Sequence, residues 1–253
     1  SACGTIVAMG LVLVESFPVG PLGCNFSLVA DEESKEALLV DPGDDLDAVL
    51  ECVARNGLKP VALLHTHAHF DHIGVSARFS TITGAPILLH EKDVPLYENL
   101  RMQGSFFGME LDAPGTVHRF VSHGDRIACG KSALEVVHTP GHTPGSVCFH
   151  LAGEGTAKPV LFSGDTLFRR SIGRTDLWGG SLPEILASIR ERLFTLPGDV
   201  LVLPGHGDTT TVADSGPTVA SRGAHMSGMA ILDAVADLRT RLDPVAAELL
   251  GCE

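Results

Sequence analysis

The chain has little positive charge and lacks both paired cysteines and long apolar runs. Its 18 lysines and arginines stand against 31 aspartates and glutamates, for a formal net charge of −13, so a nucleic acid would meet a repulsive mean field. Six cysteines are scattered without a CxxC pair, which indicates reduced thiols in a cytoplasmic protein. The apolar run 6–14 is shorter than the roughly 20 residues that cross a bilayer. We therefore expect neither a nucleic-acid nor a membrane partner.

What the chain does have is a series of short apolar runs, rich in β-branched residues and bounded by Gly, Pro or Asp, which is typical of strands. The series occurs twice, before and after residue 120. It predicts an α/β domain in which two sheets pack face to face beneath flanking helices. The expected strands are 11–17, 26–30, 37–41, 61–66, 134–139, 147–151, 160–163 and 200–203.

Two segments between these runs have apolar residues at helical spacing. The first covers 46–53 and ends before Gly57, a residue type common just beyond a helix. The second begins at Ser181, with Glu184 in capping-box register, and ends before Pro197. The first is expected to cover one face of a sheet, and the second to be a packing element that carries no site.

The composition changes toward the C-terminus. Residues 209–224 are rich in Thr, Ser, Gly and Pro, which is typical of a linker, whereas 229–250 have amphipathic helical periodicity. Gly-Ala-His-Met at 223–226 resembles a cloning remnant followed by a start methionine, so our hypothesis is that the last segment naturally precedes Ser1. We predict a catalytic domain at 1–211, a linker at 212–226 and a helical segment at 227–253.

The strongest local signal is the run Thr66-His67-Ala68-His69-Phe70-Asp71-His72, which follows an expected strand directly. Loops at strand ends are where rigid scaffolds present functional side chains. His67 and His69 lie two residues apart, so in an extended segment they point the same way and can bind one ion. Asp71 and His72 follow after the chain turns and can face a second ion. A solvated polar cluster is the alternative, and four alternated ligands in one loop argue against it.

Three further apolar runs each end in a glycine-flanked candidate ligand, namely His142, Asp165 and His206. Taken singly, His142 and His206 are each as readily explained as turn residues as they are as metal ligands. Together with the first loop they complete a ligand set for divalent metal. The full set is His67, His69, Asp71, His72, His142, Asp165 and His206.

These motifs resemble those of the metallo-β-lactamase superfamily over residues 11–211. The finer motifs Thr-Pro-Gly-His-Thr-Pro-Gly at 139–145, Ser-Gly-Asp-Thr-Leu-Phe at 163–168, Gly-Arg-Thr-Asp-Leu at 173–177 and Pro-Gly-His-Gly at 204–207 are similar to those of short bacterial glyoxalase II-like hydrolases. The resemblance implies an αββα sandwich, here with an added C-terminal helical segment. It also implies one ion on His67, His69 and His142, a second on Asp71, His72 and His206, and Asp165 bridging both.

The resemblance further implies a reaction. A water shared by two divalent ions has a pKa near neutrality, so a hydroxide nucleophile exists at working pH, and the ions polarise the substrate carbonyl. Asp71 would orient that water while binding metal. The implied substrate is a small-molecule thioester of the hydroxyacylglutathione type, S-D-lactoylglutathione. Zinc is the expected metal, with iron or manganese as alternatives, because His and Asp suit all three.

Candidate substrate contacts follow Asp165 closely: Phe168, Arg169, Arg170 and Arg174. Arginine can bind a carboxylate bidentately, although solvated loop charges explain the arginines equally well. The segment 100–114, with Met and Phe among glycines, is expected to form an apolar lid or wall, or to pack under a long loop. The chain has no counterpart of the basic C-terminal region that holds glutathione in glyoxalase II.

The same ligands allow other reactions. A persulfide dioxygenase of this superfamily would use one iron on His67, His142 and Asp165, with positions left open for oxygen, and Gly-Arg-Thr-Asp at 173–176 resembles that type. The sequence just after Asp165 favours the hydrolase. Lactone or β-lactam hydrolysis uses similar ligands, whereas the acidic charge balance counts against a nuclease. Seven intact ligands argue against a binding protein that has lost catalysis.

Overall fold

The computed structural model describes residues 5–9, 12–153 and 158–216. The chain divides into two units, residues 1–215 and 216–253, and all helices and strands given below belong to the first. The expected helical segment at 227–253 and the suggested cloning remnant at 223–226 lie outside the described residues, so both stay predictions. Within the described part, no helix combines the length and apolar character that crossing a membrane requires.

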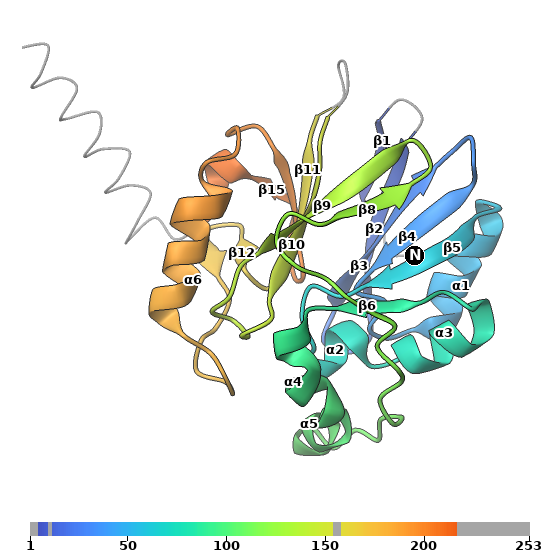
Figure 1. Cartoon of the computed structure of the whole chain (residues 1–253), viewed down its shortest axis with the longest axis horizontal. Coiled ribbons are helices and arrows are strands. Elements are labelled where there is room, and N and C mark those ends of the chain that lie inside the picture. Colours follow the sequence, from blue (N-terminus) through green and yellow to red (C-terminus); the bar gives the residue numbers. More distant parts are fainter. Residues whose placement is uncertain (1–4, 10–11, 154–157, 217–253) are drawn as a thin grey trace, which may run out of the picture. The chain divides into compact units, whose positions relative to one another are not determined.

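The first sheet has seven strands in the order β1-β2-β3-β4-β5-β6-β7 (Figure 1). Strands β1 to β4 pair antiparallel, and β4 to β7 pair parallel. The long β2–β3 hairpin pairs Val12 with Asp31 and Val19 with Cys24. The bounds are Thr5–Met9 (β1), Val12–Val19 (β2), Cys24–Asp31 (β3), Glu36–Val40 (β4), Lys59–Leu64 (β5), Ile87–Leu89 (β6) and Arg119–Phe120 (β7).

The second sheet has six strands in the order β15-β14-β11-β10-β9-β8. Only β11 and β14 pair parallel, and β12 and β13 form a separate small hairpin. The bounds are Arg126–Cys129 (β8), Ser132–His138 (β9), Val147–Leu151 (β10), Val160–Gly164 (β11), Leu167–Phe168 (β12), Ser171–Ile172 (β13), Leu201–Pro204 (β14) and Thr210–Thr211 (β15).

Helices cover the outer faces of both sheets (Figure 1). As the capping-box register predicts, the Ser181 side chain accepts a hydrogen bond from the Glu184 backbone N–H at the start of α6. This helix runs on into a π-helical turn, Ile189–Leu193. The α-helices are Leu46–Arg55 (α1), Phe70–Ile73 (α2), Ser76–Thr83 (α3), Val94–Glu98 (α4), Leu100–Phe106 (α5) and Leu182–Ser188 (α6), and the 3-10 turns are Glu91–Asp93 (η1) and Val212–Asp214 (η3).

The main core lies between the two sheets, where side chains such as Val29 and Leu64 belong to one apolar cluster with Phe149 and Phe162. Burying each such side chain contributes roughly 1.5–3 kcal/mol. A second cluster packs α1 and α3 on the outer face of the first sheet, and a third packs α6 on the second sheet. The αββα sandwich expected from the motifs is confirmed.

All eight expected strands are present, within a few residues of the expected bounds. Apart from the five-residue β1, the strands that the sequence pattern missed have two to four residues, such as β6, and a run of that length has no periodicity to read. Part of the segment 100–114 is helix α5, although its glycines suggested a loop. Gly104 is required there because an added Cβ would lie 2.7 Å from the Leu111 side chain.

The folded unit extends through Ser215, past the boundary expected at residue 211. Thr210–Thr211 pairs with β14, and Val212 is buried among the side chains under α6. The low apolar periodicity of this segment reflects a short edge strand followed by a 3-10 turn, so its first residues are packed rather than linking.

Candidate metal centre

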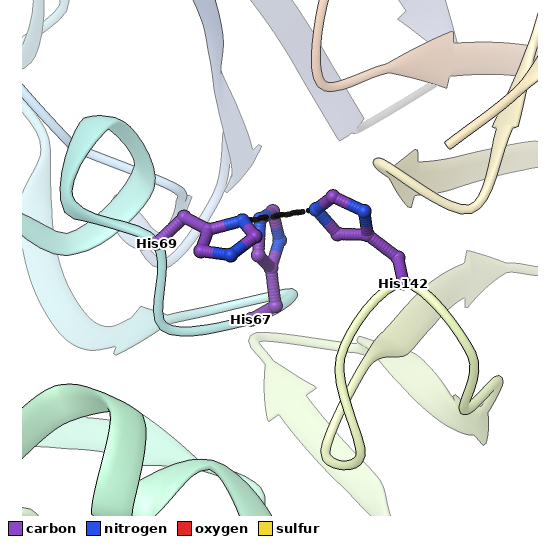
Figure 2. Close-up of side chains that lie close together, drawn as sticks. All are labelled: His67, His69 and His142. Carbon is purple, nitrogen blue, oxygen red and sulfur yellow. Dashed lines mark hydrogen bonds between the residues drawn. The ribbon is translucent and has the colours of Figure 1, made fainter. Parts of the chain in front are cut away.

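The first ligand set, which we define as His67, His69 and His142, brings three imidazole rings together from two loops (Figure 2). His67 and His69 follow β5, and His142 follows β9. The Nε2 atom of His142 lies 3.2 Å from Nε2 of His67 and 2.9 Å from Nδ1 of His69, and the last two atoms are 3.0 Å apart. Three ring nitrogens therefore converge on one point.

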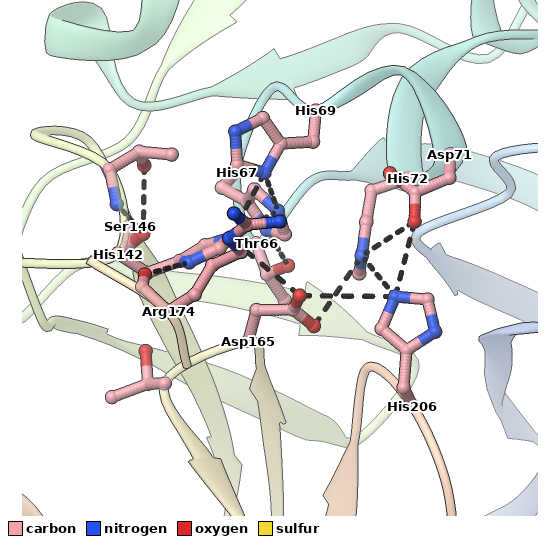
Figure 3. Close-up of polar contacts among 12 residues, drawn as sticks. Thr66, His67, His69, Asp71, His72, His142, Ser146, Asp165, Arg174 and His206 are labelled. Carbon is pink, nitrogen blue, oxygen red and sulfur yellow. Dashed lines mark hydrogen bonds and ion pairs between the residues drawn. The ribbon is translucent and has the colours of Figure 1, made fainter. Parts of the chain in front are cut away.

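The second ligand set, defined as Asp71, His72 and His206, lies beside the first (Figure 3). Asp71 and His72 belong to α2, and His206 follows β14. The His206 Nε2 atom is 3.1 Å from Oδ2 of Asp71 and 3.3 Å from Nε2 of His72. This set contains a carboxylate, which the first lacks.

Asp165, at the end of β11, lies between the two sets. Its Oδ2 is 3.6 Å from Nε2 of His142, in the first set, and its Oδ1 is 3.5 Å from Nε2 of His72, in the second. The Oδ1 atom is buried and accepts no hydrogen bond. A buried carboxylate oxygen without a donor is costly unless a cation satisfies it. Its position is the one that a bridging ligand requires.

The hydrogen bonds around the first set show that its nitrogen lone pairs point inward. His142 Nδ1 lies 2.8 Å from the Arg174 carbonyl, which can only accept, so Nδ1 carries the proton and a neutral ring presents the Nε2 lone pair. The Thr66 hydroxyl donates to Asp41 and can accept from His67 Nδ1 at 3.1 Å, which leaves the His67 Nε2 lone pair inward as well. Facing lone pairs repel unless a cation lies among them, so these residues fit a divalent metal ion.

Burial keeps the first set in the neutral form that metal binding needs. Desolvation lowers the pKa of His69 to about 3 and holds the pKa of His67 and of His142 below the usual value. In the second set burial also lowers the pKa of His206, but the hydrogen bond to Asp71 and the charge of Asp165 outweigh it and raise that pKa. The two sets therefore differ in charge as well as in composition.

Asp93, which the sequence pattern missed, ties together the two loops of the first set. Its carboxylate accepts hydrogen bonds from the Ala68 backbone N–H at 3.0 Å, the Thr143 hydroxyl at 2.8 Å and the Gly145 backbone N–H at 2.6 Å. Burial raises its pKa to about 6, although these three donors oppose the shift. Its contact with Gly145 spans 52 residues, so no local motif could have revealed it.

Asp41, at the end of β4, contacts His72 of the second set directly and reaches the loop of His67 through Thr66. It accepts hydrogen bonds from the Thr66 backbone N–H at 2.7 Å and the Thr66 hydroxyl at 2.6 Å, and it lies 3.0 Å from Nδ1 of His72. A proton on His72 Nδ1 leaves Nε2 free to face the metal centre. The backbone of Asp41 lies in the left-handed region, at φ 51°.

A glycine next to His206 allows the loops to approach closely. A Cβ added to Gly205 would lie 2.3 Å from Oδ1 of Asp165 and 2.7 Å from Cε1 of His72. The first glycine of the Pro-Gly-His-Gly motif is therefore required, because a side chain there would collide with two candidate ligands.

An open pocket of about 460 Å³ lies over the metal centre. Its floor contains five of the seven candidate ligands, and one wall is α5 with Phe106 and Phe107. Gln103 attaches this wall to the metal loop, since its side chain donates to the Ala68 carbonyl and accepts from the Phe70 backbone N–H. Part of the segment 100–114 thus forms a pocket wall. Of the two alternatives expected for this segment, an apolar wall and packing under a long loop, the structure has the wall. The lining also includes Trp178, to which the sequence assigned no role.

Of the four candidate substrate contacts, only Arg174 lines this pocket. Arg169 lines a separate cavity and lies near Asp208 and Asp214, at 3.4 and 3.9 Å. Arg170 is exposed in the turn after β12, with φ 58°, and Phe168 lies within β12 outside the pocket lining. The β12–β13 hairpin places Phe168, Arg169 and Arg170 outside the lining of this pocket, so their role as substrate contacts stays a prediction.

Comparison with known proteins places this centre in a family. A family model described as the metallo-beta-lactamase superfamily matches residues 19–206. The chain belongs to this superfamily. As a superfamily member it is a metal-dependent hydrolase, and its histidine and aspartate clusters are candidate metal-binding groups.

Several relatives of this superfamily member are similar over most of their length. An uncharacterized protein of Mycobacterium tuberculosis is 39% identical, with 79% of this chain and 93% of that protein covered. The probable metallo-hydrolase YqgX of Bacillus subtilis is 38% identical (77% and 90% covered), and the hydroxyacylglutathione hydrolase GloC of Haemophilus influenzae is 35% identical (79% and 92%). Human mitochondrial persulfide dioxygenase ETHE1 is also 35% identical, with 74% and 65% covered.

Two solved structures share the fold of this superfamily member. The B3 metallo-beta-lactamase BLEG-1 superposes with a TM-score of 0.72 at 36% identity, with 79% of this chain and 95% of that chain covered. TTHA1623, in a di-iron-bound form, superposes with a TM-score of 0.69 at 39% identity, with 78% and 93% covered.

A second family model, described as a molybdopterin cofactor-binding domain, matches residues 179–253. That is less than half of the chain, and about half of the match lies outside the described residues. The described part of the match includes α6 and β14, which are elements of the metallo-β-lactamase sandwich. The match therefore identifies no second family.

Proposed function

We propose that the protein hydrolyses thioesters at a centre of two divalent metal ions. The observation that carries the proposal is the pair of adjacent ligand sets with the Asp165 carboxylate between them. One ion would be held by His67, His69 and His142, the other by Asp71, His72 and His206, and both by Asp165. The reaction adds water across the acyl–sulfur bond and releases a carboxylic acid and a free thiol.

When bound, the two ions supply a hydroxide nucleophile near neutral pH and polarise the substrate carbonyl. The chain's own residues would hold the ions and orient the attacking water. Asp71 and Asp165 are partly exposed to the pocket floor, so their carboxylates are placed to accept a hydrogen bond from the attacking water. The Arg174 carbonyl holds the His142 proton on Nδ1, which keeps Nε2 directed at the centre.

The finer assignment is a thioester of the hydroxyacylglutathione type, such as S-D-lactoylglutathione. The resemblance of the motifs at 139–145 and 204–207 supports it, as does the similarity to GloC. Zinc is the expected metal, and the di-iron-bound state of TTHA1623 supports iron as the first alternative. A cytoplasmic location stays a prediction.

A second candidate function is persulfide oxygenation at one iron on His67, His142 and Asp165, which the similarity to human ETHE1 supports. The Nε2 atoms of His67 and His142 are close enough to share one ion with Asp165. The second ligand set favours the hydrolase because it offers a carboxylate and two imidazoles for a further ion.

The test is to purify the protein without chelators and to measure metals per chain by elemental analysis. The same sample is then assayed on S-D-lactoylglutathione, on glutathione persulfide and on a cephalosporin. We expect about two metal ions per chain and hydrolysis of S-D-lactoylglutathione. In Asp165→Ala we expect loss of metal and a fall in turnover of about a hundredfold or more, because both ions lose a ligand. Asp199→Ala, at an exposed position, is the control and should retain both.

Two results would contradict this proposal. One iron per chain with oxygen uptake on glutathione persulfide and no thioester hydrolysis would establish the dioxygenase. Faster turnover of a cephalosporin than of any thioester would instead make the protein a β-lactam hydrolase, the activity named for BLEG-1.

A further inference from the structure

The rim of the pocket over the metal centre is unusually apolar for an exposed surface. Among the described residues, nine large hydrophobic side chains are exposed, and six of them line this one pocket. They come from three separate segments: the β2–β3 turn, helix α5 and the loop before α6. The six are Leu22, Met102, Phe106, Phe107, Leu177 and Trp178.

This exposure costs free energy in the absence of a ligand. Phe106 is 80% exposed, and Phe107 and Trp178 are 62% and 58% exposed. Such side chains are normally scattered singly over a surface, and a group of them around a cavity marks a binding site. The pocket volume of about 460 Å³ falls within the range of small-molecule sites.

The pocket offers little to bind negative charge outside its floor. Arg174 is the one lysine or arginine among the described residues of the lining, and its guanidinium already forms two hydrogen bonds of 2.8 Å with the Asp176 carboxylate. To bind a substrate carboxylate, the Arg174 guanidinium would have to exchange or share this partner. Glutathione carries two carboxylates, and the described walls have no free cation placed to bind them.

We infer that the substrate of this hydrolase carries a large apolar group beside the scissile bond, and that the apolar rim selects it. The inference rests on the proposed thioester hydrolysis for the reaction, and it replaces S-D-lactoylglutathione by a more apolar thioester as the preferred substrate. The apolar recognition itself stands on the pocket alone. The short, polar lactoyl group would leave most of the rim exposed. A long alkyl or an aryl group, on either the acyl or the thiol side, would cover Phe106, Phe107 and Trp178.

Binding can be measured without hydrolysis because thioethers cannot be cleaved as thioesters are. The probes are S-methyl-, S-butyl- and S-hexylglutathione, together with the same alkyl thioethers of N-acetylcysteamine, a carrier without carboxylates. Trp178 is the only tryptophan of the chain, so quenching of its fluorescence reports binding at this wall directly. The metal-loaded protein is used throughout.

We expect affinity to rise about fourfold per added methylene, because each buried methylene is worth roughly 0.8 kcal/mol. Removing the glutathione carboxylates should change affinity by less than about threefold. In Phe106→Ala we expect a loss of about fivefold to tenfold for the hexyl probes and little change for the methyl probes. The control is Phe120→Ala, an exposed phenylalanine outside the pocket, which should bind like the unchanged protein.

A matched thioester pair then links the pocket to turnover. Hexanoylglutathione should have a higher kcat/KM than lactoylglutathione, and Phe106→Ala should remove most of that advantage. If the hexyl thioethers bind as expected but no thioester is cleaved, the proposed function fails while the apolar recognition holds.

Three results would overturn the inference. Affinity that is independent of chain length is the first, and a large loss of affinity on removal of the glutathione carboxylates is the second. The third is a rim used for self-association: Phe106→Ala would then change the oligomeric state measured by sedimentation and leave thioether affinity as it was.

Discussion

The two ligand sets lie side by side, yet the protein stabilises them differently. The first set, His67, His69 and His142, consists of imidazoles alone, and its facing lone pairs have no internal partner. In the second set, Asp71 lies within hydrogen-bond distance of His206, and Asp41 lies against the buried face of His72. The second set can therefore satisfy itself with protons when no cation is present.

This difference predicts different metal affinities. A cation entering the first set relieves repulsion between lone pairs and displaces few protons. A cation entering the second set must replace the proton that Asp71 holds on Nε2 of His206. We therefore expect the second ion to be the more weakly bound of the two, and the more sensitive to pH.

The largest test of the comparison removes one imidazole from each set. In His142→Ala we expect loss of the first ion and a fall in turnover of about a thousandfold, and in His206→Ala loss of the second ion alone with a smaller fall. Metal per chain after dialysis against graded chelator measures the difference. His123→Ala, at an exposed position, is the control. Equal loss of both ions from both variants would show that the sets bind metal as one unit.

A smaller effect is expected from the aspartates that hold the ligand loops. In Asp93→Asn an amide N–H₂ would face a backbone N–H, either that of Ala68 or that of Gly145, so the loops of the first set should loosen. In Asp41→Asn the second set should weaken more, because His72 loses its acceptor. Each variant should lower the affinity for its own ion by about 10- to 100-fold, as measured by chelator competition.

Asp199→Asn, again at an exposed position, is the matched control for both of these substitutions. If Asp93→Asn and Asp41→Asn weakened the same ion, the assignment of one aspartate to each set would be wrong.

The smallest effect is on the pH dependence of folding stability in the chelated protein. The two sets should change the stability in opposite directions as pH rises. The pKa values of His67, His69 and His142 lie below the usual 6.5. The unfolded chain therefore binds more protons than the folded one, and stability falls as pH drops below 6.5, toward a pKa of about 3 for His69. The pKa of His206 and of His72 is raised, so their contribution is complete below 6.5 and is lost as pH rises through those values.

Histidine side-chain NMR of the chelated protein, followed over pH, measures these titrations one ring at a time. Denaturant unfolding at the same pH values gives the stability. Titration of all five rings together near pH 6.5 would contradict the distinction between the two sets.

Local sequence determines the ligand loop, most strands and the start of α6. The His-x-His-x-Asp-His spacing places four ligands in one loop because an extended segment alternates its side chains and the following turn redirects them. The strands and the α6 cap are likewise local, since a hydrophobic run or a serine at the first position of a helix acts on its own neighbours. These features were predictable because their physics extends over a few residues.

Tertiary structure alone decided how the ligands are supported and what they face. Asp93 reaches Gly145, and the Arg174 carbonyl reaches His142, only because separate strands end at the same edge of the sandwich. The walls of the pocket form when α5 and Trp178, far apart in the chain, meet over the metal centre, while Arg169, close to Asp165 in sequence, lines another cavity. Ligand identity depends on residue type and spacing, whereas the environment of a ligand depends on which distant segments pack against it.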